Sequence, residues 1–94
     1  MLAKRIFYDK QINPIKGTII EMVIWHLPSP VVGSRHRFKY RLYFGRAGER
    51  VVGYDNEQPK GDHRHVDGRE LPYQSTTLEQ LIADFLAAVR EAGG

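Results

Sequence analysis

The sequence of 94 residues contains no cysteine. This absence excludes a disulfide scaffold, a thiolate zinc finger, a cysteine nucleophile and an iron–sulfur centre. Charged residues interrupt the chain too often for a membrane-spanning segment, and residues 1–5 lack the apolar run of a signal peptide. We therefore expect a cytoplasmic protein with no membrane partner.

The sequence also lacks the familiar signatures of cofactor and nucleotide chemistry. It has no P-loop, no dinucleotide-binding glycine pattern, no Gly-x-Ser-x-Gly elbow and no His-Glu-x-x-His helix. We therefore expect no cofactor. The composition, 41% hydrophobic and 27% charged, is too apolar for a disordered chain. A chain of this length forms one domain, so we expect residues 1–94 to fold as a unit.

Positive charge is concentrated in the middle of the chain. The net charge is +3, but residues 35–50 carry six basic groups and one acidic group, a local charge of +5. Residues 1–34 carry +2, and residues 51–94 carry −4. The clustering indicates a polyanion, above all a nucleic acid, as the first partner to consider.

The first two thirds of the chain is predicted to form strands, within about residues 3–66. Residues 18–27 are β-branched and aromatic almost throughout, and residues 35–44 alternate between two kinds of side chain. A glycine-containing turn then leads into residues 50–55, which we expect to pair antiparallel with the preceding strand. Residues 56–73 are polar and lack strong periodicity, which is more typical of a functional loop than of a linker, and a short strand is possible within them at His63–Val66.

A helix is predicted over about residues 77–92. Thr76 and Glu79 have capping-box spacing, apolar residues recur from Leu78 to Val89 at helical spacing, and Gly93 ends the pattern. One such helix can cover one face of a small sheet. The sequence therefore predicts an α+β fold: an antiparallel sheet of four or five strands with one C-terminal amphipathic helix packed on one face.

The other face of this sheet would be left to a row of basic side chains. Cations at alternate positions of a strand lie roughly 7 Å apart, which is close to the spacing of successive phosphates in a nucleic acid strand. A tyrosine at the end of the row could stack on a base. The alternative interpretation is a solvated face that keeps the protein soluble, but such faces usually mix charges of both signs. The row consists of Arg35, Arg37, Lys39, Arg41 and Tyr43, and Lys60 is a further candidate for contact with nucleic acid.

A second candidate motif is the run of residues 60–65. If this run is extended, His63 and His65 share a face and Arg64 points away. Two imidazoles can divide a proton transfer, one as base for a ribose 2′-OH and the other as acid for the leaving 5′-oxygen. Arg64 and the basic row could stabilise the charged transition state, and Asp62 or Asp55 could orient a ring. Two alternatives remain open: inert surface histidines, and a metal site completed by Asp62, Asp67 or His36.

Several runs of residues resemble the TumE-type toxin family over about residues 5–90. They are Glu21–Trp25, Ser34–Leu42, Val52–Glu57, Lys60–His65 and Glu70–Tyr73. The members are small bacterial and archaeal proteins grouped as toxins of type II toxin–antitoxin pairs. The resemblance implies a cytoplasmic growth inhibitor encoded beside a helix-turn-helix antitoxin that neutralises it. Ribonuclease action is an analogy with other small basic toxins.

The residue pattern and the resemblance agree on a nucleic-acid target, and only the residue pattern points to His63 and His65. The lead hypothesis is a toxin that binds RNA, either free or on the ribosome, and cleaves it without a metal ion. His63, His65, Arg64 and Asp62 are the predicted catalytic residues. One rival hypothesis is a non-enzymatic basic module that blocks a nucleic acid or a protein by occupancy, and another is a metal-dependent hydrolase that uses the two histidines. A homodimer is compatible with either, because small sheets often expose an edge.

Overall fold

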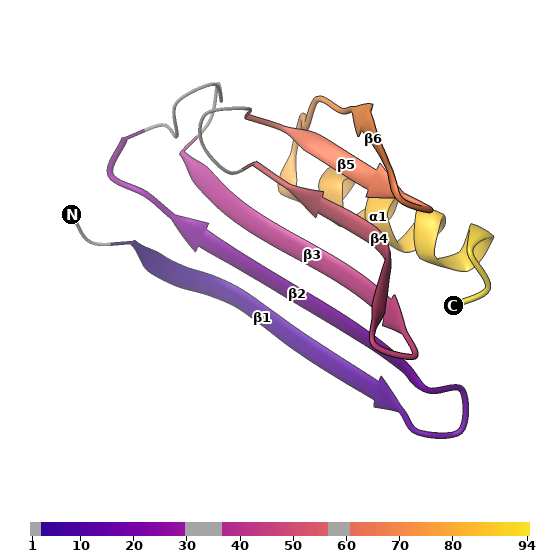
Figure 1. Cartoon of the computed structure of the whole chain (residues 1–94). Helices are drawn as coiled ribbons and strands as arrows, with labels where there is room; N and C mark the ends of the chain where they lie inside the picture. The colour runs from indigo at the N-terminus through magenta and orange to yellow at the C-terminus, as the bar shows by residue number, and fades with distance from the viewer. Residues whose placement is uncertain (1–2, 30–36, 57–60) are drawn as a thin grey trace.

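The computed structural model describes residues 3–29, 37–56 and 61–94 of the chain. Its strands form a single antiparallel sheet in which each strand pairs with its neighbours in sequence, and one helix follows (Figure 1). The predicted α+β class is confirmed, with six strands instead of the four or five expected. The elements are β1 (Lys4–Asn13), β2 (Thr18–His26), β3 (Phe38–Arg46), β4 (Glu49–Asp55), β5 (His63–Val66), β6 (Arg69–Pro72) and α1 (Leu78–Glu91).

Two tight turns explain how the central and last hairpins close. Ala47 and Gly48 link β3 to β4 with φ of 53° and 80°, and Asp67 and Gly68 link β5 to β6 with φ of 50° and 78°. A two-residue turn with positive φ at both central residues has a twist that matches the twist of the paired strands. Glycine and aspartate tolerate positive φ better than most residues.

The hairpin of β5 and β6 lies in the segment that the sequence indicated to be a functional loop, residues 56–73. Both strands have only four residues, and none of these residues is fully buried, so they leave little hydrophobic periodicity in the sequence. The backbone pairing, from His63 opposite Pro72 to Val66 opposite Arg69, defines the hairpin instead. The expected loop therefore contains the sixth strand.

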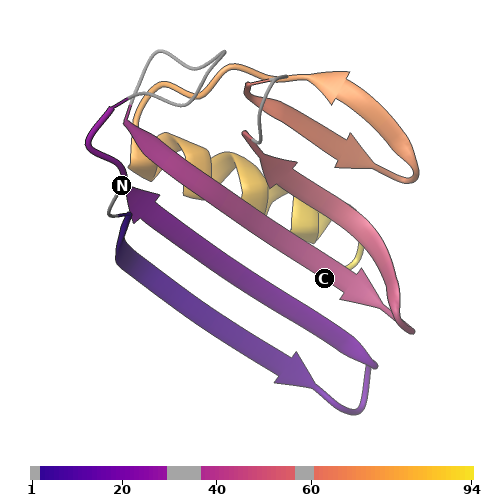
Figure 2. The ribbon, with the colours of Figure 1, turned by 60° about the vertical axis from the view of Figure 1, so that its left-hand side comes forward.

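The helix covers one face of the sheet (Figure 2). Leu81, Phe85 and Val89 lie one turn apart and are buried against the sheet. Each such side chain contributes about 1.5–3 kcal/mol when fully buried. The side chain of Thr77 caps the helix by accepting a hydrogen bond from the backbone of Gln80, so the predicted cap at Thr76 is wrong by one residue. Within the described residues, no helix has the length and apolar character needed to cross a membrane.

One buried and one partly buried polar side chain fix the ends of β3 and β4. The amide of Asn56 accepts a hydrogen bond from the backbone N–H of Tyr40 (3.0 Å) and donates one to the carbonyl of Phe38 (2.6 Å). The carboxylate of Asp62 accepts hydrogen bonds from the Tyr40 hydroxyl (2.6 Å) and from the hydroxyl and backbone N–H of Ser75 (2.9 and 3.0 Å). Burial, and then this hydrogen bond to Asp62, raises the pKa of Tyr40. These contacts connect β3 to the segments before β5 and before α1.

The opposite face of the sheet carries no helix, and we call it the open face. Because Tyr40, Leu42 and Phe44 are buried in the core beneath α1, the alternating residues of β3 lie on the other side. Strand pairing extends this face over the neighbouring strands. The open face includes Glu21 and Trp25 of β2, Lys39, Arg41 and Tyr43 of β3, Arg50, Gly53 and Asp55 of β4, His63 and His65 of β5, and Glu70 of β6.

Candidate functional site on the open face

Strand register brings the two histidines of β5 beside the end of β4. His63 lies opposite Asp55, and His65 lies opposite Gly53. The Nε2 atom of His63 is 2.8 Å from Oδ1 of Asp55, and its Nδ1 atom is 2.9 Å from the carbonyl oxygen of Gly61. The two imidazole rings meet edge to face with centroids 5.4 Å apart. The predicted common face of His63 and His65 is therefore what the structure shows.

The contacts of His63 hold its ring at two points. A carbonyl oxygen and a carboxylate are both acceptors, and one ring nitrogen lies within hydrogen-bond distance of each. The ring of His63 is therefore oriented on the open face by Gly61 and Asp55.

His65 has different surroundings. Its Nε2 atom is 3.5 Å from Oε1 of Glu70, the residue that lies opposite it on β6. Burial, and next the positive charge of Arg50, lowers the pKa of His65 below its usual value. The neutral form is therefore favoured near neutral pH, and a neutral imidazole can accept a proton. The two histidines thus differ in their surroundings.

A hollow of about 490 Å³ on the open face extends to Asp55, the carboxylate that contacts His63. Gly53 leaves room for it because the glycine places no side chain between Tyr43 and Asp55. The Tyr43 ring folds over Gly45 instead, and Cδ of Arg50 would lie 2.8 Å from a Cβ atom at position 53. The residues that line the hollow are Glu21, Arg41, Leu42, Tyr43, Arg50, Gly53 and Asp55.

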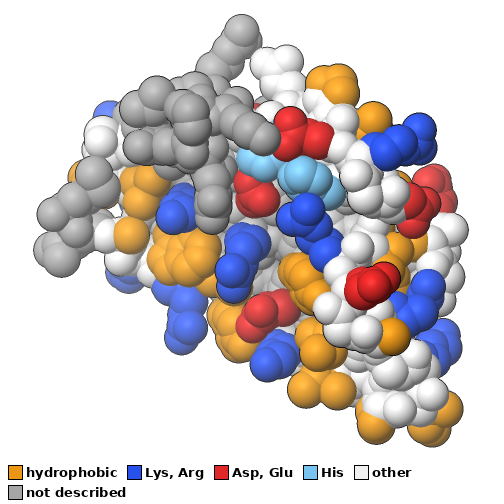
Figure 3. Space-filling view, in the orientation of Figure 1, with side chains coloured by type: hydrophobic (Ala, Val, Ile, Leu, Met, Phe, Trp, Pro, Cys, Tyr) orange, Lys and Arg blue, Asp and Glu red, His pale blue; other side chains and the backbone are white. Residues whose placement is uncertain are grey.

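Positive charge surrounds this hollow on two sides. Arg41 lies on β3, 3.9 Å from the carboxylate of Glu21, and Arg50 lies across Gly53 on β4. Lysine and arginine side chains are spread over the open face, with the histidines next to them (Figure 3). The lining of the hollow thus combines the guanidinium groups of Arg41 and Arg50 with the carboxylates of Glu21 and Asp55, and Asp55 contacts His63.

The other predicted nucleic-acid contacts have mixed outcomes. Lys39 lies on the open face with Nζ 5.8 Å from the centre of the Trp25 ring. Arg37 is exposed but precedes β3 and is not part of the strand. Arg35 and Lys60 lie outside the described residues. The structure therefore brings Lys39, Arg41 and Tyr43 together in the predicted row.

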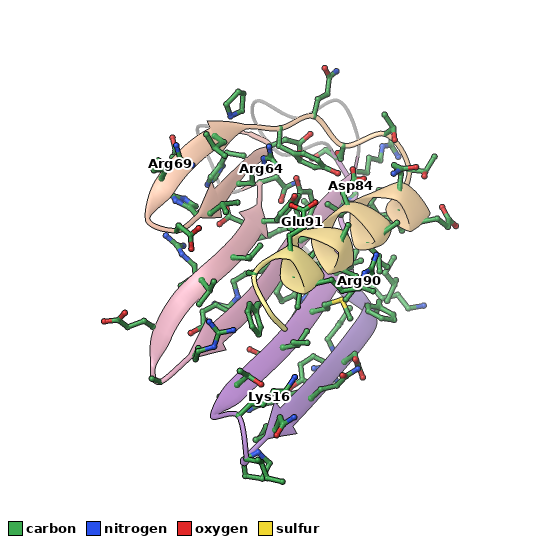
Figure 4. The ribbon with its side chains drawn as sticks, turned by 90° about the vertical axis from the view of Figure 1, so that its right-hand side faces the viewer. Lys16, Arg64, Arg69, Asp84, Arg90 and Glu91 are labelled. Carbon is green, nitrogen blue, oxygen red and sulfur yellow. The ribbon has the colours of Figure 1, made fainter. Side chains whose placement is uncertain are left out.

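The side chains of two of the four predicted catalytic residues, Arg64 and Asp62, make their contacts away from the histidine rings. Arg64 points to the face covered by α1 (Figure 4), where it donates a hydrogen bond to the Tyr54 hydroxyl at 3.2 Å and its Nε atom is buried. Asp62 is engaged by Tyr40 and Ser75. Alternation along β5 explains why Arg64 points away from the two histidines. Of the two aspartates expected to orient a histidine ring, Asp62 and Asp55, it is Asp55 that makes the contact.

Sequence reasoning missed Arg50, Gly53 and Glu70. Arg50 was counted in the basic segment but not assigned a role, because it follows a turn and lies outside the alternating row. Glu70 belongs to a strand that was not predicted. No pattern along the sequence could have linked these residues to the histidines, because the strand register alone does so.

A metal ion is the other chemistry that this cluster could host. Ligand atoms of His63, His65 and Glu70 lie within 4.8 Å of one another. Both ring nitrogens of His63 are engaged, however, by Gly61 and Asp55, so a metal would have to displace one of these contacts. Asp62 is likewise engaged, and His36 lies outside the described residues. A metal ion at this cluster would therefore replace a contact of His63 with Asp55 or Gly61, whereas proton transfer would keep it.

The comparison with protein families assigns the chain to a class of toxins. The family model described as Toxin TumE matches residues 2–92. The chain therefore belongs to the TumE toxin family, as its sequence motifs indicated, and a toxin of this kind has an antitoxin as partner. No curated protein and no solved structure matches the chain.

Proposed function

We propose that this toxin is a metal-independent ribonuclease whose active site is the histidine pair and the adjoining hollow on the open face. The observation that carries the proposal is the different surroundings of two histidines in ring contact: His63 lies between two acceptors, and His65 is favoured in its neutral form next to Arg50. The toxin acts in the cytoplasm on RNA, free or on the ribosome, and a helix-turn-helix antitoxin neutralises it as in a type II pair.

The proposed reaction divides the proton transfers between the two rings. His65 takes the proton of the ribose 2′-OH, and the oxygen attacks the adjacent phosphorus. His63, oriented by Asp55, gives its proton to the leaving 5′-oxygen, so that a 2′,3′-cyclic phosphate and a 5′-hydroxyl result. Positioned acid and base groups of this kind each contribute about 10²–10⁴-fold.

The cationic side chains stabilise and hold the substrate. Arg50 and Arg41 lie beside the hollow, where they can neutralise charge that develops on the phosphoryl oxygens. Arg50 takes the part that sequence reasoning gave to Arg64. Lys39 continues the positive surface along β3, and Tyr43 offers a ring near the hollow for a base to stack on.

The test is to incubate the purified protein with total RNA and with ribosomes, with and without a chelator. The His63→Ala/His65→Ala variant should lose at least about 10²-fold in cleavage while its RNA affinity changes by no more than about threefold. His26→Ala is the matched control, because this exposed histidine lies on the other face of the sheet and should leave cleavage unchanged.

Each contrary result selects a rival. Cleavage that survives in the double variant would refute the assignment of His63 and His65 as catalytic residues. Cleavage abolished by the chelator would favour the metal-dependent hydrolase. Salt-sensitive RNA binding without cleavage by the native protein would favour inhibition by occupancy, which the positive charge of the open face also supports.

A further inference from the structure

The two edges of the sheet differ in how they are protected. β6 has four residues and ends at Pro72, and short edge strands with charge and proline resist pairing with other chains. β1 has ten residues, contains no proline, and within the described part of the chain pairs only with β2 (Figure 1). Its outer side therefore presents backbone donors and acceptors for another strand.

The exposed apolar side chains gather at the same edge. They occur on β1, on the turn after it and at the start of β2, and Ile12 is 62% exposed. Ile12 pairs directly with Ile19, and Tyr8 lies on the same face of β1 as Ile12. Exposed apolar side chains that gather at one edge often mark a contact with a partner. The large hydrophobic side chains that are exposed among the described residues are Ile6, Phe7, Tyr8, Ile12, Ile15 and Ile19.

A β-bulge limits the part of β1 that can accept a flat partner strand. The register shifts between Arg5 and Phe7, so the uninterrupted segment is Phe7–Asn13. Lys4, Arg5, Lys10 and Lys16 surround this segment with positive charge. The one acid of β1, Asp9, already accepts a hydrogen bond from Gln11 at 3.0 Å. Tyr8, Lys10 and Ile12 share one face of β1. The edge therefore fits an extended segment that carries an acid opposite Lys10 and apolar side chains two residues to either side of it.

A second copy of the chain fits this edge poorly. An antiparallel pairing that uses the whole of Phe7–Asn13 about a two-fold axis places Lys10 opposite the Lys10 of the other copy. Like charges directly opposite each other in a sheet are destabilising. The charge of the edge thus favours a different chain over a homodimer.

We propose that β1 binds an extended acidic segment of the antitoxin as a seventh strand of the sheet. Backbone hydrogen bonds along Phe7–Asn13 supply affinity, and pairing of acids with Lys10 and Arg5 sets the register. The proposal depends on the toxin family and not on ribonuclease activity, because three strands separate β1 from the β5 histidines. Loss of antitoxin binding and loss of RNA cleavage can therefore be measured independently.

Amide hydrogen exchange of the free protein and of its complex with the purified antitoxin tests the proposal. Amides in Phe7–Asn13 should exchange at least about tenfold more slowly in the complex, because strand addition ties up the outward N–H groups. The β6 edge is the internal control and should not change. Protection at β6 or elsewhere with β1 unchanged overturns the proposal. So does a free protein that sediments as a dimer with β1 already protected.

Variants of the edge give a second measurement that does not depend on exchange. Lys10→Glu/Ile12→Glu should weaken antitoxin affinity at least tenfold, and the loss should shrink in high salt. Both side chains are exposed, so the fold should persist. Arg69→Glu, an equally exposed cation beside the other edge, should change the affinity by less than about threefold. Unchanged affinity in the double variant would refute an antitoxin strand at β1.

Discussion

Replacement of Gly53 by alanine separates the stability of the sheet from the chemistry proposed for the open face. Gly53 lies in a strand interior, and its φ is not in the left-handed region, so alanine can adopt the same backbone conformation. Glycine costs about 0.5–1 kcal/mol relative to alanine inside a strand. The new Cβ atom would, however, lie 2.8 Å from Cδ of Arg50 and would force that side chain to move.

The expected result of Gly53→Ala is a protein that is at least as stable as the original and much less active. Arg50 is exposed and can rotate away at little cost, so Tm should stay the same or rise by about 2–6 °C. Loss of a positioned charge-stabilising group costs about 10²–10³-fold in the rate. Because Arg50 is displaced and not removed, a loss of about 10-fold or more in RNA cleavage is expected.

A double-variant cycle identifies the cause of the loss. If Gly53→Ala acts through Arg50, then Gly53→Ala/Arg50→Ala should cleave RNA no more slowly than Arg50→Ala alone. Cleavage is measured under single-turnover conditions with a chelator present, and Tm by circular dichroism. Native cleavage by Gly53→Ala would refute the role of Arg50, and a further large loss in the double variant would show that the hollow acts independently of it.

Four further predictions concern the site and its support. Asp55→Asn keeps an acceptor beside His63 but replaces the charged contact that orients the ring at 2.8 Å by a weaker neutral one, so single-turnover cleavage should fall about 10–100-fold with Tm nearly unchanged; native cleavage would contradict the proposed orientation. Arg50→Ala removes a cause of the lowered pKa of His65, so the acidic limb of the pH–rate profile, where His65 gains its proton as pH falls, should move to higher pH; an unmoved limb would exclude His65 as the base. Lys39→Glu/Arg41→Glu should weaken RNA binding at all sequences and reduce the salt slope of log K by about 0.7 for each lost phosphate contact, and a slope equal to the native one would place RNA elsewhere. Asn56→Ala should lower the free energy of unfolding in urea by about 2–4 kcal/mol, because it leaves two buried backbone groups without their hydrogen-bond partner. Asn13→Ala, at the exposed end of β1, should lower it by less than about 1 kcal/mol.

The sequence predicts the parts of this protein that depend on periodicity. Alternation along residues 37–44 places Lys39 and Arg41 opposite the buried Tyr40 and Leu42, and helical spacing identifies the face with Leu81 and Phe85. The α+β class follows from these two patterns. Both are local, because each compares a residue with neighbours a few positions away.

The parts that the sequence could not predict depend on pairing between strands. The β5–β6 hairpin is too short and too exposed to show a hydrophobic period, so Glu70 could not be placed beside His65. Asp62 and Asp55 are equally plausible partners for a histidine from their sequence positions. Tertiary contacts distinguish them, because Ser75 and Tyr40 engage Asp62 and leave the contact with His63 to Asp55.

The alternation of β5 also explains how so small a protein can hold a polar site without weakening its core. Successive side chains of a strand point to opposite faces, so four residues serve two purposes. His63 and His65 face the open side, whereas Arg64 reaches the Tyr54 hydroxyl beneath the sheet. The positive charge at the site comes from β3 and β4, although residues 51–94 carry a net charge of −4. The sheet therefore joins a basic segment and an acidic one at their boundary, and Asp55, His63, His65 and Arg50 meet there.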